Sequence, residues 1–356
     1  MTVFHLVLVR PSHYDDEGYV IQWMRSGIPS NTLAALNGLA QDCANRRILG
    51  DGVDIRVTAI DEANTKVDVN RLARMIQRDG GHGLIGLAGV QTNQYPRAFD
   101  IARKCREQGL QVCIGGFHVS GILAMLPGPT PELEAATDLG ISLYAGEAET
   151  RFDEVLIDAF SRRLKPVYNY LDDLPNVDGE PPPFMPVDRI YKTLSKVTSF
   201  DAGRGCPFVC SFCSIINVHG RKSRFRGPDD VERVIRDNAA QGIARFFITD
   251  DNFARNRNWE SILDRIIELR ENEDVCEDAI CEAAEGRVVR LQEFVSRTGH
   301  QELWLLEGGT LLRVDLELGF SEEVRIDGNP EHINILPDHD RLVLDARGEQ
   351  RLRFFD

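Results

Sequence analysis

Three cysteines stand close together near the middle of the chain. Cys206, Cys210 and Cys213 fall within eight positions, directly after an apolar run that predicts a strand. A loop this short can present three thiolates to three irons of a cubane iron–sulfur cluster. The fourth iron is then open to chelate a substrate. The spacing therefore indicates a chemically active cluster.

Zinc is the main alternative for the same thiols. A structural zinc site needs a fourth ligand, and the nearest candidate, His219, does not complete a familiar zinc-finger spacing. Simple burial is the third interpretation, because isolated cysteines often behave as small core residues. We give that interpretation to Cys43, Cys105 and Cys113, since each stands alone in a predicted helix or strand.

The first part of the chain must position any ligand that acts with these thiols. In residues 1–165 short apolar runs alternate with helical patterns, which predicts a parallel sheet covered by helices. Asn31 is expected to cap the first helix and Gly109 to end the third. Five strands joined in this way favour a flavodoxin-like (Rossmann-like) α/β fold. The expected strands are residues 4–9, 54–59, 84–90, 111–115 and 141–145, and the helices 32–46, 69–78, 95–108, 132–139 and 150–161.

The rest of the chain divides by composition. Residues 166–195 include three consecutive prolines and are predicted to be a linker. Residues 196–275 carry the cysteine loop between βα repeats, the opening of a partial (β/α) barrel. Residues 276–356 predict a helix at about 281–296 and then a short antiparallel β tail. The expected elements of the barrel part are strands 197–201 and 244–249 and helices 229–241 and 259–273.

The cysteine spacing Cys206-x3-Cys210-x2-Cys213, with Phe212 before the last thiol, resembles the radical S-adenosylmethionine (SAM) superfamily motif. The resemblance implies a [4Fe-4S] cluster whose open iron binds the amino and carboxylate groups of SAM. Reductive cleavage of the sulfonium then gives a 5′-deoxyadenosyl radical. The resemblance also implies SAM contacts from Phe212, Thr249, Asp250, Asp251 and Asn252. In a simpler interpretation, the two aspartates only cap the next helix.

The loops after the front strands resemble the cobalamin-binding domain of B12-dependent radical SAM proteins, above all residues 114–121 and 146–149. No Asp-x-His-x-x-Gly motif is present, so we assign no histidine to the lower face of cobalt. His118 has an equally weighted alternative, a hydrogen bond within its own loop. The residues implied to contact cobalamin are Ser12, Thr92, Asn93, Gly115, Gly116, His118, Gly146 and Glu147.

Composition limits the partners. A net charge of −15 argues against a nucleic-acid-binding surface, because the average field repels phosphate. The first residues lack the basic start and cleavage site of a secretory signal, and no apolar run is long enough to span a membrane. We therefore expect a cytoplasmic location.

The family resemblance implies an enzyme that transfers a methyl group to an unactivated carbon of a small-molecule substrate, or that directs a rearrangement there. It would need a one-electron reductant such as flavodoxin or ferredoxin. Only two βα units are recognisable before the strand-rich tail, so we expect a truncated or fused C-terminal part. The alternative function is therefore a non-catalytic cobalamin- and cluster-binding protein.

Overall fold

A computed structural model describes residues 2–128, 130–194, 196–208, 213–250, 253, 256–273 and 275–276, and beyond them the backbone of short strands. The chain forms two units, Met1–Ala279 and Ile280–Asp356. Every predicted site residue belongs to the first unit.

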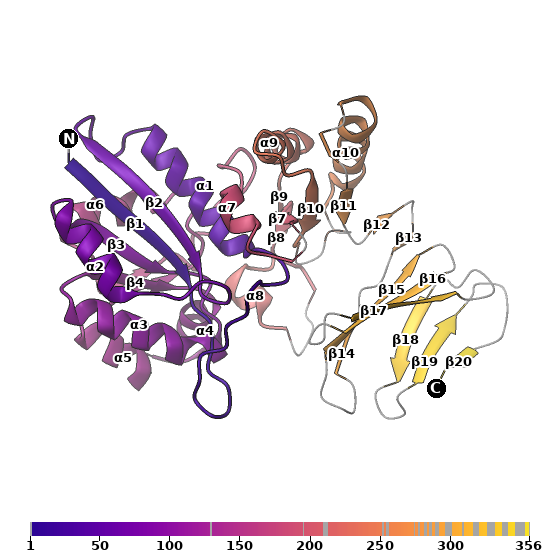
Figure 1. The fold of residues 1–356 in the computed structure, drawn as a ribbon, viewed down its shortest axis with the longest axis horizontal. Helices are drawn as coiled ribbons and strands as arrows, with labels where there is room; N and C mark the ends of the chain where they lie inside the picture. The colour runs from indigo at the N-terminus through magenta and orange to yellow at the C-terminus, as the bar shows by residue number, and fades with distance from the viewer. Residues whose placement is uncertain are drawn as a thin grey trace. The chain divides into compact units, whose positions relative to one another are not determined.

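The first unit begins with a parallel sheet in the order β2-β1-β3-β4-β5-β6 (Figure 1). β1 (Thr2–Arg10) lies between β2 and β3, and its apolar run is buried on both faces, as is usual in a central parallel strand. The first five strands have the flavodoxin-like order that the sequence predicts, and a sixth extends the edge. The other strands are β2 (Val53–Asp61), β3 (His82–Leu87), β4 (Gln111–Gly115), β5 (Ser142–Ala145) and β6 (Val167–Asn169).

Helices cover both faces of this sheet (Figure 1). Alternate side chains of β1 enter two apolar cores, Val7 and Val9 in one and Leu6 and Leu8 in the other. The first core packs on the four helices α2 (Val69–Arg78), α3 (Tyr95–Glu107), α4 (Phe117–Met125) and α5 (Pro131–Asp138). The second core packs on α1 (Asn31–Asn45) and α6 (Phe152–Phe160).

Of the two helix ends that the sequence specified, one differs in the structure and one agrees. The cap of α1 is Ser30, whose hydroxyl accepts from the Leu33 amide at 3.3 Å, so the assignment of Asn31 was wrong. The shift is one residue, and both residue types can cap a helix. Gly109 follows α3 with a φ of +74°, which confirms it as the stop. Neither α4 nor the short turn η1 (Thr92–Gln94) was predicted, because their sequences read as loops.

The proline-rich segment packs on the front sheet's helices. The amide of Phe184 donates to the carbonyl of Ala34 in α1 at 2.9 Å. A Cβ on Gly38 of α1 would stand 2.1 Å from the Pro182 carbonyl oxygen. The segment also contains α7 (Val187–Ile190), and its contacts with α1 fix its path.

A second βα region follows. β7 (Thr198–Phe200) and β10 (Arg245–Ile248) pair in parallel, and β11 (Asp278–Ile280) joins their sheet. Between β7 and β10 the chain makes a small antiparallel pair that brackets the cysteine loop. The remaining elements are β8 (Gly203–Arg204), β9 (Arg224–Phe225), α8 (Ile215–Val218), α9 (Pro228–Ala239) and α10 (Trp259–Glu273).

The second unit consists of antiparallel strands in its described parts. The helix predicted at 281–296 was wrong, because that stretch contains short strands. Gly286 disfavours a helix interior and the neighbouring valines favour strands. The strands are β12 (Ala283–Ala284), β13 (Arg287–Val288), β14 (Gln292–Val295), β15 (Gln301–Glu307), β16 (Thr310–Asp315), β17 (Phe320–Arg325), β18 (His332–Leu336), β19 (Arg341–Asp345) and β20 (Arg353–Phe355).

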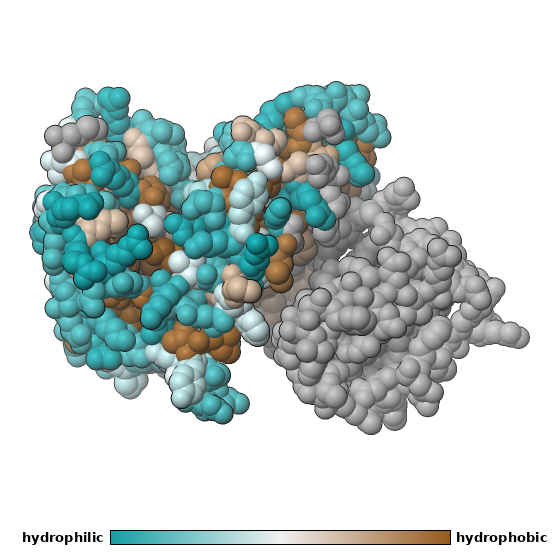
Figure 2. Space-filling view, viewed as in Figure 1, coloured by the Kyte–Doolittle hydropathy of each residue, from teal (hydrophilic) through white to brown (hydrophobic). Residues whose placement is uncertain are grey.

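Polar residues cover most of the visible face of the first unit (Figure 2). Within the described residues, no helix combines the length and the apolar character needed to cross a bilayer.

Candidate functional site

A cavity of about 220 Å³ lies at the carboxyl ends of β1, β3, β4 and β5. Leu39 of α1 and Phe152 of α6 line it, so it lies on the face that these two helices cover. The strand order reverses between β1 and β3, and open α/β sheets bind ligands at the carboxyl edge beside such a reversal. The cavity is therefore the first candidate site.

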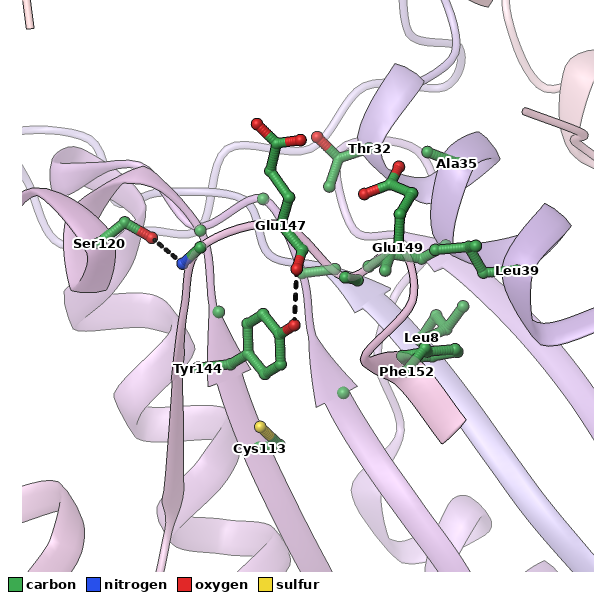
Figure 3. A pocket seen from close by; sticks show the side chains of 18 of the residues that line it. Leu8, Thr32, Ala35, Leu39, Cys113, Ser120, Tyr144, Glu147, Glu149 and Phe152 are labelled. Atoms are coloured by element: carbon green, nitrogen blue, oxygen red, sulfur yellow. Dashed lines mark hydrogen bonds between the residues drawn. The ribbon is translucent and has the colours of Figure 1, made fainter. Parts of the chain in front are cut away.

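The cavity has an apolar floor and a polar rim. Leu8 and Phe152 lie deep in it, whereas the carboxylates of Glu147 and Glu149 lie at its upper end (Figure 3). Cys113 also lines the deep part, and burial raises the pKa of its thiol to about 12. This thiol is neutral at physiological pH and acts as a small apolar group.

Glycines make room at the strand ends. Gly116 has a φ of +142°, and a Cβ there would stand 2.1 Å from the Val90 amide nitrogen. Gly146 has a φ of +104°, and its Cβ would be 3.0 Å from the Tyr170 carbonyl. Close backbone approach thus requires glycine at both positions.

The roof of the cavity comes from the second βα region. Arg204, Val218 and His219 line the cavity together with the front-sheet loops. The rings of His219 and Phe117 lie 5.0 Å apart between centroids. Segments that flank the cysteines are thus packed directly on the front sheet.

A buried cluster of charged side chains joins Arg204, in the roof of the cavity, to Glu147 and Glu149 at its rim. The Arg204 guanidinium donates to Glu147 at 3.0 Å, to Glu149 at 2.7 Å and to Asp201 at 2.9 Å. Burial would raise the pKa of Glu149, but the charge of Arg204 and its hydrogen bond together outweigh burial and lower the pKa. The pKa of Asp201 is likewise lowered, since Arg204 and Arg226 outweigh its burial. Both acids are therefore ionised at neutral pH.

Two further arginines brace the same region. Arg224 donates to Glu147 at 2.7 Å and to the Pro175 carbonyl at 2.7 Å. Arg226 is fully buried and donates to the carbonyls of Asp201 and Val177 at 3.1 and 3.0 Å. These arginines tie the segment after the cysteines to the proline-rich segment.

The cysteine loop starts at a glycine in the left-handed conformation. Gly205 has a φ of +82°, and a Cβ there would stand 2.6 Å from the Lys222 carbonyl oxygen. The Cys206 amide donates to the Gly220 carbonyl at 3.3 Å, which closes the loop on itself. Cys206 and Cys213 are partly exposed. Cys210 and Phe212 lie outside the described residues, so the three-thiol geometry stays a prediction.

Other described cysteines differ from these two. Cys43, Cys105, Cys113 and Cys276 are buried. Burial raises the pKa of Cys105 to about 12, as it does for Cys113. Their burial agrees with the interpretation of Cys43, Cys105 and Cys113 as core residues. In the described part of the chain no three His, Cys, Asp or Glu side chains form a group that could hold a metal.

Two of the residues implied to contact SAM, Thr249 and Asp250, directly follow β10. The Thr249 hydroxyl donates to the Phe200 carbonyl at 3.2 Å, and the Asp250 carboxylate accepts from the Ala202 amide at 2.6 Å. Thr249 thus ties the end of β10 to the end of β7, and Asp250 ties it to the residue two positions after β7. Asp251 and Asn252 lie outside the described residues.

The residues implied to contact cobalamin separate into two groups. Gly115, Gly116, Gly146 and Glu147 line the cavity. Ser12, Thr92, Asn93 and His118 are not part of its lining.

Two of the second group have partners of their own. The buried Ser12 amide donates to Glu62 at 3.1 Å. His118 lies between Thr92, at 3.4 Å, and Glu132, at 3.3 Å. Burial lowers the pKa of His118 against the opposing effect of Glu132, so the ring is neutral at physiological pH. Both contacts reach outside residues 114–121, to η1 and α5, so they are not the hydrogen bond within its own loop that the alternative interpretation expected.

Sequence reasoning missed the lining from the helices and the arginines. Thr32, Ala35 and Leu39 face the cavity from α1, and their helical spacing is a usable signal for one face. Arg204 stands two residues before Cys206, and nothing in its sequence context shows that its partners lie in the front sheet.

No family model matches the chain. Two curated relatives are methyltransferases of Chlorobaculum tepidum. Bacteriochlorophyllide d C-8(2)-methyltransferase is 31% identical over 205 residues, which cover 52% of this chain and 42% of the relative. Bacteriochlorophyllide d C-12(1)-methyltransferase is 28% identical over 198 residues, 53% of this chain and 40% of the relative. The chain spans less than half the length of these relatives.

A solved structure shares the fold. The radical SAM methyltransferase TsrM from Kitasatospora setae, solved with cobalamin and a [4Fe-4S] cluster bound, superposes with a TM-score of 0.51. The match covers 77% of this chain and 54% of that chain at 14% identity. The chain is therefore similar in sequence to curated methyltransferases and in fold to a radical SAM methyltransferase.

Proposed function

We propose that the first unit binds cobalamin at the sheet-edge cavity and a [4Fe-4S] cluster on Cys206, Cys210 and Cys213, as part of a radical SAM methyltransferase. The observation that carries this proposal is that residues on both sides of the cysteines and residues of the front sheet line the same cavity. Arg204 and His219, on the two sides of the cysteines, line the same cavity as Gly116. The likeness to methyltransferases in sequence, and to TsrM in fold, supports the same reaction class.

The cavity suits part of a cobalamin. The cavity volume of about 220 Å³ is far below the volume of a whole cobalamin. The cavity can therefore hold one group that projects from the corrin ring, while the ring itself lies at the open edge. The floor is apolar and the strand ends are glycines, which allow a bulky ligand to approach the backbone. His118 does not line the cavity, so we assign no lower ligand to cobalt.

The thiols suit a cluster. Cys206 and Cys213 are partly exposed, in contrast to the buried thiols of the front sheet, and accessible thiols can lose a proton to metal. When bound, the cluster would supply an electron to the sulfonium of SAM, and methylcobalamin would supply the methyl group for an unactivated carbon. A small-molecule substrate and a one-electron reductant such as flavodoxin or ferredoxin complete this proposal.

The chain's own residues supply positioning. Phe117 and His219 line the cavity with their rings in contact, which brings the segment after the cysteines against the front sheet. We propose that Thr249, Asp250, Asp251 and Asn252 contact the amino group of SAM, and that Phe212 is a further SAM contact. Carbonyl and carboxylate oxygens at a strand end can accept such bonds.

Cluster binding is tested on protein purified without oxygen. We expect about four iron and four sulfide per chain after reconstitution, and a loss of both in Cys210→Ala. Zinc without sulfide would overturn the cluster and support the zinc alternative.

Cobalamin binding is tested by filling the cavity. Ala35 lies on the cavity face of α1, so Ala35→Phe should weaken cobalamin binding at least about tenfold in an absorbance titration. Gln41→Phe, on the exposed side of the same helix, is the matched control and should bind as the wild type does. Equal binding by both variants would place cobalamin elsewhere.

A non-catalytic cobalamin- and cluster-binding protein is the second candidate. It is favoured by the small sheet of the second βα region, in which β11, β10 and β7 are joined. Release of 5′-deoxyadenosine from SAM by the reduced, reconstituted protein supports catalysis. A bound cluster that leaves SAM intact favours the second candidate.

A further inference from the structure

We propose that Glu147 is a positioning residue for the cysteine loop, and that through it cobalamin in the cavity and the cluster on the cysteines strengthen each other's binding. This inference rests on the function proposed above. It gives Glu147 a different role from the cobalamin contact that the sequence implied.

Strands β8 and β9 flank the cysteine loop and carry buried charges, and we call this pair of strands the neck. Residues 205–223 leave and re-enter the fold through β8 and β9, where Arg204 is paired directly with Arg224. Both arginine side chains are largely buried, with 12% and 7% of their surface exposed. Two like charges directly opposite each other on paired strands repel, and more strongly where water is excluded.

Glu147 offsets part of this repulsion, because its carboxylate is bonded to both arginines. One oxygen of its carboxylate, Oε2, accepts from Nη1 of Arg204 at 3.0 Å and from Nη1 of Arg224 at 2.7 Å. The other oxygen, Oε1, accepts from Nη2 of Arg224. One carboxylate of the front sheet thus bridges both strands of the neck. Because it already accepts three hydrogen bonds, it has little capacity left for a ligand in the cavity.

Residues that line the cavity hold the backbone at Glu147 in place. The Tyr144 hydroxyl donates to the Glu147 carbonyl at 2.7 Å, and the Gly146 amide donates to the Ser120 hydroxyl at 3.2 Å (Figure 3). Tyr144 and Ser120 also line the cavity. A ligand there would therefore contact the residues that hold Glu147 in place, and also Arg204 in the roof.

Mutual strengthening follows from this arrangement. A ligand that contacts Arg204 and the residues around Glu147 stabilises the bridge from Glu147 to Arg204 and Arg224, and with it the two strands that flank the cysteine loop. Coupling between two binding events is reciprocal, so a cluster on the cysteines must favour the ligand by the same factor. We expect cobalamin to bind about 5- to 100-fold more tightly to the cluster-loaded protein than to the cluster-free protein.

The experiment measures the cobalamin Kd of the full chain by absorbance titration, with and without the reconstituted cluster. In Glu147→Gln the ratio of the two Kd values should fall to within about twofold of one, and iron content after reconstitution should drop at least about threefold. Glu147→Asp keeps the charge and should restore part of the coupling. Glu154→Gln, an acid of α6 that pairs with Lys165, is the control and should keep the wild-type ratio.

A second variant covers the case in which Glu147→Gln does not fold, as judged by circular dichroism. In Arg224→Gln the Glu147 carboxylate keeps its ion pair with Arg204 but loses its ion pair with β9. The ratio of the two cobalamin Kd values should therefore also fall most of the way to one. Wild-type coupling in the folded variants overturns the inference, as does a wild-type Kd that is the same with and without the cluster. Wild-type protein that binds no cobalamin at all overturns the proposed function, and this inference with it.

Discussion

The front sheet and the neck of the cysteine loop are held in place by different interactions. β1 pairs with β2 over nine residues and is buried between two apolar cores, whereas β8 and β9 pair over two residues each. The neck is fixed instead by the buried arginines Arg204, Arg224 and Arg226. Backbone ladders and apolar burial thus shape the cavity, while charged side chains set the loop that carries the thiols.

Removing a buried arginine tests the second half of this comparison. Arg226→Met should lower the free energy of unfolding by about 3–5 kcal/mol, because buried carbonyls lose their donor. Arg236→Met is the control, since Arg236 pairs with Glu273 at the exposed surface, and its effect should be much smaller. Chemical denaturation measures both. Equal effects would mean that the neck does not depend on buried charge.

Adding one methyl group tests the first half. Gly116→Ala should cost about 3 kcal/mol, because its Cβ would clash with the Val90 backbone at a φ that alanine disfavours. Gly52→Ala meets no atom within 4 Å and should change stability by less than about 0.5 kcal/mol. A Gly116→Ala variant with the stability of the wild type would contradict the close approach of the Gly116 backbone to the Val90 backbone.

Thiol reactivity distinguishes the two regions without mutation. In native, metal-free protein at pH 8, Cys206 and Cys213 should react with a thiol reagent at least about a hundredfold faster than Cys105 and Cys113. Burial keeps the latter two protonated until about pH 12. Peptide mapping by mass spectrometry identifies the modified residues. Rapid labelling of Cys113 in folded protein would contradict its place in the cavity floor.

Acid should affect the charged junction first. The folded-state pKa of Glu149 is lowered, so its stabilising contribution is complete above about pH 4.5 and is lost as pH falls through the folded pKa. Between pH 5 and 3 the wild type should lose up to about 1 kcal/mol more stability than Glu149→Gln. Glu134→Gln, on the exposed side of α5, should follow the wild type. Parallel pH curves for all three proteins would rule out this contribution.

The sequence predicted most of the front sheet because its pattern is local. Strand β4 and helix α2 have the predicted bounds, and the other predicted strands and helices of the front sheet differ by a few residues at their ends. Prediction failed where local signals conflict. The Gly115-Gly116 pair reads as a loop, yet α4 starts directly after it, and Gly116 has a φ of +142° where its backbone approaches Val90.

Only part of the candidate site could be predicted from the sequence. Strand-end residues such as Gly146 could be found, because every parallel strand ends at the same edge of the sheet. Cavity residues on α1 and α6 could not, since apolar residues on a helix face read as ordinary core. Glu147 was chosen for its position, but its arginine partners lie far along the chain.

By itself the sequence determined the parallel front sheet, the spacing of Cys206, Cys210 and Cys213, and the glycines at the strand ends. Those properties are encoded in short windows of hydrophobic period and residue type. Tertiary structure alone decided that the cysteine neck sits over the front-sheet cavity and that Glu147 bridges Arg204 and Arg224. Such contacts join residues far apart in the chain, and whether an acid is buried against an arginine depends on the folded packing of both segments.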